Sequence, residues 1–342
     1  MFYVEECDTC VLNNSSSCCL MNISCFDFQL FLAIYYVFGA TGFIGREFLR
    51  CLDREKRDFS VVRILSRKNK DISFLEDLNL NIEYIQGSIT SQKDVETAIK
   101  GASHVVNLVG ILYPTRNSSF DSIHHESVKN IARICNSGSV QQFVHISALG
   151  SSLDSSSEYA RTKALGEKAA LSLFPQSTVL KPSIVYGPED DFFNRFYRMA
   201  KISPVLPLVG GGQTQFQPVH VSDVAQAILV CLDEKQSVVG GKVYELGGPH
   251  VKTFRQLLRL MLRYSDPPLK RLLVPMPFWL AKTQSIVFEL AHQLFGVAPM
   301  LTMDQVELLK TDNIVTAGSL NLLDLGITPK KLSKDTLSYL KS

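Results

Sequence analysis

A glycine-rich turn, "VFGATGFIG" at residues 37–45, constrains the fold of this chain more than any other feature. Gly39, Gly42 and Gly45 are spaced three apart, between a continuous apolar run and a segment with helical spacing. Glycines in a strand–turn–helix unit let the backbone turn tightly and approach a pyrophosphate at the helix N-terminus. The stretch therefore predicts dinucleotide binding, and the alternative is a turn whose glycines serve only close packing.

The segments that follow alternate between short apolar runs and helical patterns. Strands are expected at residues 31–38, 60–66, 81–86, 104–110 and 142–147, with helices at 43–56, 91–101 and 122–138. Continuous apolar strands that alternate with helices form parallel sheets covered on both faces. We therefore predict an α/β, Rossmann-like, doubly wound parallel sheet.

The composition and periodicity of the sequence change after residue 183, where a Pro/Gly-rich stretch leads into helical segments. At about 150 residues per domain, 342 residues suggest two units. We predict an unmatched leader (1–30), an NAD(P)-binding domain (31–182) and a smaller, mostly helical C-terminal lobe on the substrate side (183–342). Within that lobe we expect one helix capped by Ser222 or Asp223 and a capping box beginning at Thr302.

The charge balance and the leader exclude several classes of protein. Lys and Arg total 35 against 33 Asp and Glu, a net charge of +2 without a basic run, so nothing predicts nucleic-acid binding. The pair Cys7 and Cys10 forms a CxxC, but the leader has no histidine and its other cysteines are irregularly spaced, so no metal site is expected.

The leader also fits no targeting signal or membrane span. It has no Lys or Arg before Arg46, whereas secretory signals and mitochondrial presequences both need positive charge. The apolar run at residues 28–38 has 11 residues, well short of the roughly 20 that cross a bilayer. We therefore expect a buried strand there, and no transmembrane span in the chain.

The end of the second expected strand favours NADP(H) over NAD(H). Sites specific for NAD place Asp or Glu there to bind the ribose 2′-hydroxyl. Here the strand ends with Ser66, Arg67 and Lys68, and no carboxylate occurs before Asp71. Arg and Lys would attract a 2′-phosphate, although a solvated basic loop is the alternative.

Candidate catalytic residues occur in "SSSEYARTKALGEK". Tyr159 and Lys163 are four apart on an expected helix and project from one face, where the ammonium would lower the pKa of the phenol. Ser147 ends the fifth strand, so its hydroxyl would orient a substrate carbonyl or hydroxyl. We interpret His124 and His125 as a packed or solvated helix face rather than a pair of ligands.

Several motifs together resemble a known family. "GATGFIG", "HISALG", "YARTK" and "KPSIVYGPED" are similar to the extended, epimerase-like branch of the short-chain dehydrogenase/reductase superfamily. "FQPVHVSDVAQAI", "LLVPMPFWLA" and "DQVELLKTDNIV" further resemble the alpha-subcomplex subunit 9 family, the NADPH-binding accessory subunits of respiratory complex I. The likeness runs from about residue 35 to the C-terminus.

The resemblance implies a bound NADPH and assigns its contacts. The residues that it places at the cofactor are Gly39, Thr41, Gly42, Phe43, Ile44, Gly45, Arg67, Lys68, Ser88, Val109, Tyr159 and Lys163. Among them, Arg67 would meet the 2′-phosphate, and Tyr159 and Lys163 would lie near the nicotinamide ribose. The chain departs from the superfamily at Ser88, where many members place an Asp that contacts adenine.

Three functions stay open at this stage. The first is a complex I subunit with a structural NADPH and peripheral membrane contact, cytoplasmic if bacterial and on the matrix side of the inner membrane if eukaryotic. The second is a stand-alone NADP-dependent oxidoreductase or epimerase that uses Ser147, Tyr159 and Lys163. The third is a non-catalytic sensor of the NADPH/NADP ratio. The sequence does not specify a substrate.

Overall fold

The first strand shows why the sheet is covered on both faces. The computed structural model describes residues 33–55, 61–67, 72–233 and 239–341. In β1 (Ile34–Phe38), Tyr35 and Val37 are buried in one apolar core, whereas Tyr36 and Phe38 are buried in a second core. Successive strand side chains point to opposite faces, so a strand that is apolar throughout requires cover on both sides.

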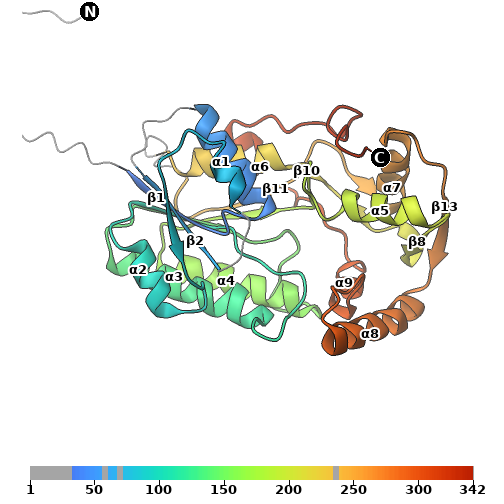
Figure 1. Cartoon of the computed structure of the whole chain (residues 1–342), viewed down its shortest axis with the longest axis horizontal. Helices are drawn as coiled ribbons and strands as arrows, with labels where there is room; N and C mark the ends of the chain where they lie inside the picture. The colour runs from blue at the N-terminus through green and yellow to red at the C-terminus, as the bar shows by residue number, and fades with distance from the viewer. Residues whose placement is uncertain (1–32, 56–60, 68–71, 234–238, 342) are drawn as a thin grey trace, which may run out of the picture. The chain divides into compact units, whose positions relative to one another are not determined.

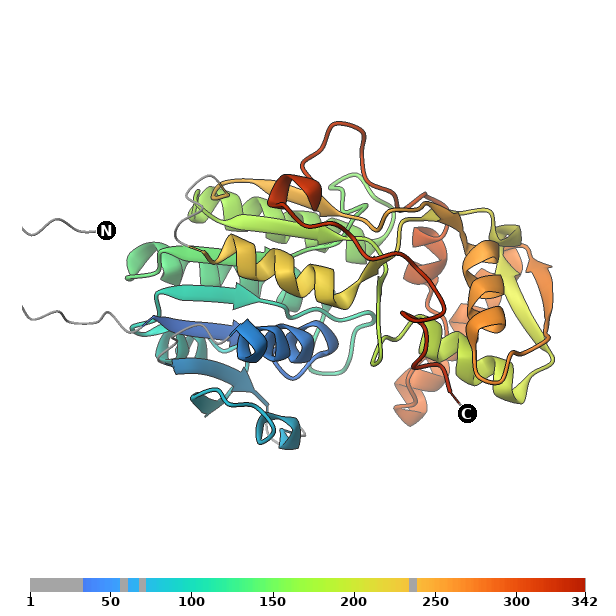
Figure 2. The same cartoon turned by 90° about the horizontal axis from the view of Figure 1, so that it is seen from above.

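The main sheet has seven parallel strands in the order β11-β6-β5-β4-β1-β2-β3. Val37 in β1 pairs with Ile64 on one side and Val106 on the other. The remaining strands are β2 (Val61–Ser66), β3 (Ile82–Gln86), β4 (His104–Asn107), β5 (Gln142–Ile146), β6 (Thr178–Pro182) and β11 (Val243–Leu246). This topology confirms the predicted doubly wound fold (Figure 2).

Helices cover both faces of the sheet (Figure 1). One face carries α1 (Phe43–Glu55) and α6 (Val221–Cys231). The other carries α2 (Gln92–Ile99), α3 (Ser127–Ser137) and α4 (Glu158–Leu173). A π-helical turn, Ser122–Glu126, leads into α3, so the helix expected at 122–138 has an irregular first turn.

The C-terminal lobe consists of short strands and helices packed around a core of its own. This core includes Tyr186, Phe193 and Phe254. Its strands pair in twos, β7 (Val185–Tyr186) with β10 (Val219–His220), β9 (Gln215–Phe216) with β12 (Lys252–Thr253), and β8 (Val205–Val209) with β13 (Leu272–Met276). Its helices are α5 (Phe193–Ile202), α7 (Phe254–Tyr264), α8 (Phe278–Phe295) and α9 (Met303–Leu308). Short 3₁₀ turns lie at Ser73–Leu75, Gly210–Gly212 and Leu323–Leu325.

The division expected at residue 183 assigns α6 and β11 to the C-terminal lobe, whereas both belong to the sheet layer. Val243 in β11 pairs with Val179 in β6, and α6 packs against α1 on one face of the sheet. A strand's own sequence does not reveal its pairing partner, because pairing depends on contacts distant in the chain.

The helix caps give one confirmation and one correction. The capping box at Thr302 is present, since its side chain accepts a bond from Gln305 N. The cap expected from Ser222 or Asp223 on α6 is wrong, because the imidazole of His220 accepts from Ser222 N instead.

Candidate functional site

The glycine turn joins β1 to α1, and a side chain at its first or last glycine would meet the neighbouring backbone. Gly39 has φ +82°, which favours glycine, and its carbonyl accepts a hydrogen bond of 3.0 Å from Gly42 N. A Cβ on Gly45 would lie 2.4 Å from the carbonyl oxygen of Gly39. Both glycines are therefore required by the backbone, and the first turn of α1, which has no acidic residue, suits an anion.

A cavity of ≈ 230 Å³ opens beside this turn, at the carboxyl ends of β1, β2, β3 and β4. Ligands of open α/β sheets bind at this edge. The structure brings six of the predicted cofactor residues together in its wall, namely Gly39, Thr41, Gly42, Arg67, Ser88 and Val109. They come from four separate strand ends.

Three other predicted cofactor residues, Phe43, Ile44 and Gly45, lie in the first turn of α1 and do not line the cavity. The side chain of Ile44 packs against the core under α1, and the ring of Phe43 lies beside Gly187. Their contribution to an anion site would come from backbone N–H groups. Lys68 lies outside the described residues.

Arg67 is exposed at the end of β2 and lines the cavity. Its carbonyl oxygen lies 3.4 Å from the donating hydroxyl of Tyr84, which ties the strand end to β3. Within the described residues, no carboxylate forms an ion pair with its guanidinium. A phosphate in the cavity would therefore meet an uncompensated cation.

The loop after β3 is hydrogen-bonded to the side chain of Asp94 on α2. Ser88 N donates to Asp94 Oδ2 at 2.9 Å, and the hydroxyl of Ser88 lies 2.8 Å from that of Thr90. Asp94 also lies where a Cβ on Gly87 would clash, 2.9 Å from that position. A carboxylate is thus present at this loop, although it comes from α2 and binds the backbone.

Lys163 is buried on α4, and its ammonium donates to the carbonyl oxygen of Ile146 at 3.1 Å. Burial lowers the pKa of Lys163 to about 8, while the charge of Glu167 acts in the opposite direction. Burial, together with the charge of Asp304, raises the pKa of Tyr159 to about 12. The expectation that Lys163 lowers the pKa of the Tyr159 phenol is therefore wrong in this structure.

Ser147 is buried at the end of β5, and its hydroxyl donates to Glu167 Oε1. The same oxygen accepts from Ser151, and the other oxygen of Glu167 pairs with Lys181 Nζ at 3.3 Å. A hydroxyl has one proton to donate, so Ser147 in this arrangement offers a ligand only acceptor lone pairs. It is not arranged to donate to a substrate carbonyl.

Comparison with known proteins assigns the fold. Residues 35–247 match the NAD dependent epimerase/dehydratase family. The chain belongs to that family. Within it, the chain is 33% identical over 320 residues to "NADH dehydrogenase [ubiquinone] 1 alpha subcomplex subunit 9, mitochondrial" of Arabidopsis thaliana, covering 89% of this chain and 76% of that protein.

The mouse protein of the same name is 30% identical over 311 residues, which cover 89% of this chain and 79% of that protein. The chain thus also belongs to the family of alpha subcomplex subunit 9. Among solved structures, the NADP(H) complex of the Citrobacter triphenylmethane reductase superposes with a TM-score of 0.68 at 19% identity, over 90% of this chain and 99% of that one. That likeness supports the fold alone.

Reasoning from the sequence missed two residues of this site. Glu167 was not predicted, although it continues the spacing of Tyr159 and Lys163 by one further turn of α4. Asp304 was missed without any local signal. Its carboxylate accepts from Ser157 Oγ at 2.7 Å and Glu158 N at 2.6 Å, so it caps α4 from α9, far along the chain.

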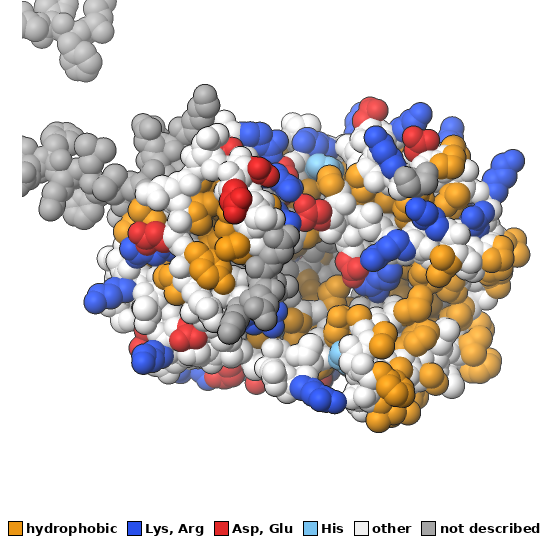
Figure 3. Space-filling view, viewed as in Figure 1, with side chains coloured by type: hydrophobic (Ala, Val, Ile, Leu, Met, Phe, Trp, Pro, Cys, Tyr) orange, Lys and Arg blue, Asp and Glu red, His pale blue; other side chains and the backbone are white. Residues whose placement is uncertain are grey.

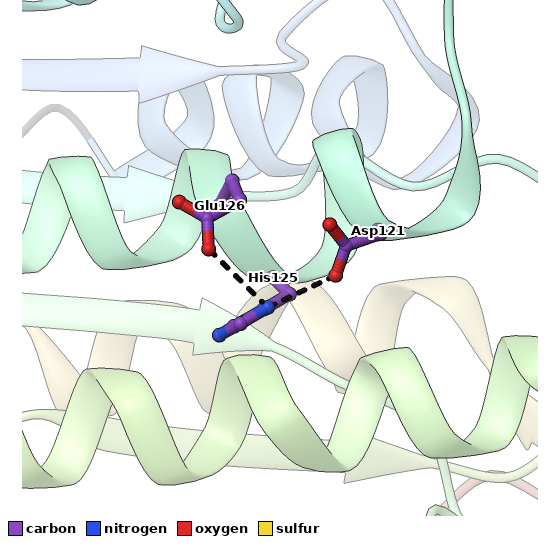
Figure 4. Close-up of side chains that lie close together, drawn as sticks. All are labelled: Asp121, His125 and Glu126. Atoms are coloured by element: carbon purple, nitrogen blue, oxygen red, sulfur yellow. Dashed lines mark hydrogen bonds and ion pairs between the residues drawn. The ribbon is translucent and has the colours of Figure 1, made fainter.

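The two adjacent histidines lie on a packed and a partly exposed face, as expected. His124 is fully buried beneath the cavity wall. His125 Nδ1 lies 3.0 Å from Asp121 Oδ1 and 3.5 Å from Glu126 Oε1 (Figure 4). Lys129 Nζ also pairs with Glu126 Oε1 at 3.0 Å, so this cluster of charges is accounted for by ion pairs on the helix surface.

None of the helices in the described part of the chain combines the length and apolar character that crossing a membrane requires.

Proposed function

We propose that this protein holds NADPH at the carboxyl edge of its sheet and acts as an accessory subunit of respiratory complex I. The observation that carries the proposal is the cavity beside the glycine turn, where Arg67 rather than a carboxylate directly follows β2. The relatives named for complex I support the partner. The proposed location is the membrane surface, on the cytoplasmic side in a bacterium or the matrix side in a mitochondrion.

NADP carries a pyrophosphate and a 2′-phosphate, and the glycine turn and Arg67 offer one binding group for each. The N–H groups of the first turn of α1 would hold the pyrophosphate, and Arg67 would pair with the 2′-phosphate. Lys163 would donate to the nicotinamide ribose, with its ammonium kept in place by the Ile146 carbonyl. The bound nucleotide would supply hydride chemistry only if a proton donor faced its ring.

The hydrogen bonds around the predicted triad favour a cofactor that is held rather than turned over. The hydroxyl proton of Ser147 is engaged by Glu167, and the pKa of Tyr159 is raised to about 12 rather than lowered. A general acid works best when its pKa lies near the operating pH. Tyr159 is therefore a poor proton donor and acceptor in this state.

The C-terminal lobe presents a surface suited to a partner or to a bilayer. Helix α8 buries only Ala281 and Ser285, and apolar side chains on its outer face stay exposed. We call this the α8 face, and its residues are Trp279, Ile286, Val287, Leu290, Leu294 and Phe295. Figure 3 shows apolar side chains gathered over this region and β13. Exposed apolar patches of this kind mark interaction sites.

The strongest alternative is a stand-alone NADP-dependent oxidoreductase. The presence of Tyr159 and Lys163 one turn apart on α4 favours it, because a structural nucleotide does not require a phenol there. This alternative predicts that Tyr159→Phe abolishes turnover of a carbonyl substrate while the affinity for NADPH persists.

The proposed cofactor is tested by titrating NADPH and NADH into the purified full-length chain. Arg67→Ser should weaken NADPH binding about 10- to 100-fold, because one charge-assisted contact is lost, and should leave NADH binding unchanged. Arg198→Ser, at an exposed arginine on α5, is the matched control and should change neither affinity. Equal losses for both nucleotides, or wild-type protein that prefers NADH, would contradict the assignment.

A further inference from the structure

The segment of residues 110–118 forms part of the cavity wall and also reaches the C-terminal lobe. It follows β4, and Gly110, Ile111 and Ser118 line the cavity. We call it the bridging segment. A turn closes it near its far end, where the backbones of Thr115 and Ser118 exchange two hydrogen bonds.

The cavity side of the bridging segment is fixed by His124. Ile111 N donates to His124 Nε2 at 3.0 Å, and His124 Nδ1 lies 3.2 Å from the hydroxyl of Thr162 on α4. That hydroxyl donates to the carbonyl of Glu158 at 2.9 Å, so it accepts from Nδ1. His124 is therefore the Nδ1–H tautomer, and both of its nitrogens are used.

Burial, reinforced by the charge of Lys163, lowers the pKa of His124 to about 2, so the ring stays neutral and this pairing persists across physiological pH. The surrounding packing is tight. A Cβ on Gly166 of α4 would lie 2.0 Å from the carbonyl oxygen of His124, in the π-helical turn. The ring of Tyr159 lies edge-on to that of His124, with centroids 5.2 Å apart. His124 thus ties the cavity wall to the helix that bears Tyr159 and Lys163.

The far side of the bridging segment contacts the last turn of α8. His292 Nε2 lies 3.3 Å from the carbonyl oxygen of Pro114, and Arg116 Nη2 donates to the carbonyl of Gln293 at 3.4 Å. The ring of Tyr113 packs edge-on against His292, with centroids 5.3 Å apart. Tyr113, Pro114 and Arg116, which lie within four residues of one another, thus all contact the end of α8.

The C-terminal end of α8 is closed locally, since Gly296 N donates to the His292 carbonyl and His292 Nδ1 lies 2.9 Å from the Val297 carbonyl oxygen, whereas the contacts of the helix with α9 lie nearer its start. The two buried side chains of the helix, Ala281 and Ser285, lie in its first half, and Lys282 pairs there with Glu307 of α9. Glu289 accepts from Met303 N at 2.7 Å, one turn before His292. Beyond that point, the contacts of His292 and Gln293 with the bridging segment join α8 to the sheet layer.

We propose that the bridging segment couples the nucleotide cavity to the C-terminal end of α8. A nucleotide that fills the cavity packs against Gly110 and Ile111 and further restricts the segment, the restricted segment holds His292 and Gln293, and the end of α8 is stabilised. By linkage, a partner that orders this end of α8 strengthens nucleotide binding by the same factor. The inference rests on the proposed function, since it requires a nucleotide in the cavity.

Hydrogen–deuterium exchange of the full-length protein, with and without saturating NADPH, tests the coupling. We expect amides of the bridging segment and of residues 290–297 to exchange at least about fivefold more slowly when NADPH is bound. Amides of α7, which is remote from the bridging segment, should not change and provide the internal control. Protection confined to the cavity wall, with α8 unchanged, would overturn the proposal.

Variants at the exposed end of the link separate coupling from folding. His292→Ala should abolish the NADPH-dependent protection of residues 290–297 and leave that of Ile111 in place. Gln284→Ala, at an exposed position earlier in the same helix and outside the α8 face, is the matched control and should retain both effects. Equal protection of α8 in the His292→Ala protein and the wild type would contradict the assigned path.

A second pair of variants tests the cavity side. His124→Gln keeps an acceptor where Nε2 meets Ile111 N, whereas His124→Asn keeps only the contact with Thr162. We expect His124→Asn to lose about tenfold in NADPH affinity and to lose the protection of α8, and His124→Gln to retain both. Equal effects of the two would show a merely structural role. Calorimetry without any NADPH binding would instead refute the proposed function itself.

Discussion

Lys163 carries a charge in surroundings that a folded protein disfavours. Its ammonium is buried, and among the described residues it donates to a neutral carbonyl, that of Ile146, rather than to a carboxylate. Burial of a charge costs free energy unless it is well paired. A residue that destabilises the free protein is expected where ligand binding needs it.

Lys163→Met should therefore raise the free energy of unfolding of the nucleotide-free protein at pH 7 by about 1–3 kcal/mol. The pKa of Lys163 is about 8 in the folded state against 10.5 for an ordinary lysine, so the unfolded chain binds more protons between these values. The cost of the charge is full below pH 8 and is relieved as the pH rises toward 10.5. The gain from the substitution should shrink over the same window.

Denaturant titrations at pH 7 and pH 10 measure this gain. Lys168→Met, at an exposed position on the same helix, is the control and should shift stability by less than about 0.5 kcal/mol at either pH. A Lys163→Met protein that is less stable than the wild type at pH 7 would show that the buried ammonium is favourably compensated.

The sequence predicted the site residues that belong to a recognisable local motif. Gly39 and Gly45 are required by the backbone where the glycine spacing placed them, and Arg67 lies at the cavity. The direction of the Tyr159 pKa shift was not predictable. It depends on burial and on Asp304, a residue 145 positions away whose approach only the folded chain reveals.

Among the elements, α8 is distinguished by an apolar face that the described residues leave uncovered. Trp279 at its first turn is 69% exposed and Phe295 at its last is 76% exposed. The apolar positions recur three and four residues apart, which places them along one side of the helix. Such a face either enters the surface of a bilayer or packs against another protein.

The membrane contact proposed above predicts a fluorescence change on binding vesicles. Trp279 is the single tryptophan of the chain, so its emission reports on the α8 face alone. It should shift to shorter wavelength when vesicles of phosphatidylcholine and phosphatidylglycerol are added. Leu294→Glu should weaken vesicle binding at least about tenfold, since a charge replaces an exposed apolar side chain that the bilayer would bury.

Arg259→Glu, a charge change on α7 away from the α8 face, provides the control for that variant. No shift of Trp279 emission on vesicles, together with a shift when purified complex I lacking this subunit is added, would assign the face to a protein partner instead.

Elements with strong periodicity were predicted, and those that depend on distant contacts were not. The parallel strands β1 to β5 follow short runs rich in apolar residues, so their existence could be read from the sequence. The π-helical turn before α3 has no sequence signature, although it sets the position of His124. The cap of α6 by His220 was missed because Ser and Asp are the residues normally preferred there.

For the whole molecule, the predicted two-part architecture misses the return of the chain to the sheet. Residues from Ala33 onward form one unit, because α6 and β11 come back after the first segment of the C-terminal lobe. That return joins the lobe bearing α8 to the sheet bearing the nucleotide cavity by several crossings of the chain. A ligand at one end and a partner at the other then act on a single folded unit.

The central claim is that this unit holds NADPH without turning it over. The most direct measurement is the nucleotide content and reactivity of native protein purified from its own membranes. We expect about one NADPH per chain, retained through dialysis and not oxidised by a panel of aldehydes and ketones, with the protein recovered together with complex I subunits. Protein recovered alone from the soluble fraction, free of nucleotide and oxidising added NADPH with a carbonyl substrate, would contradict the account.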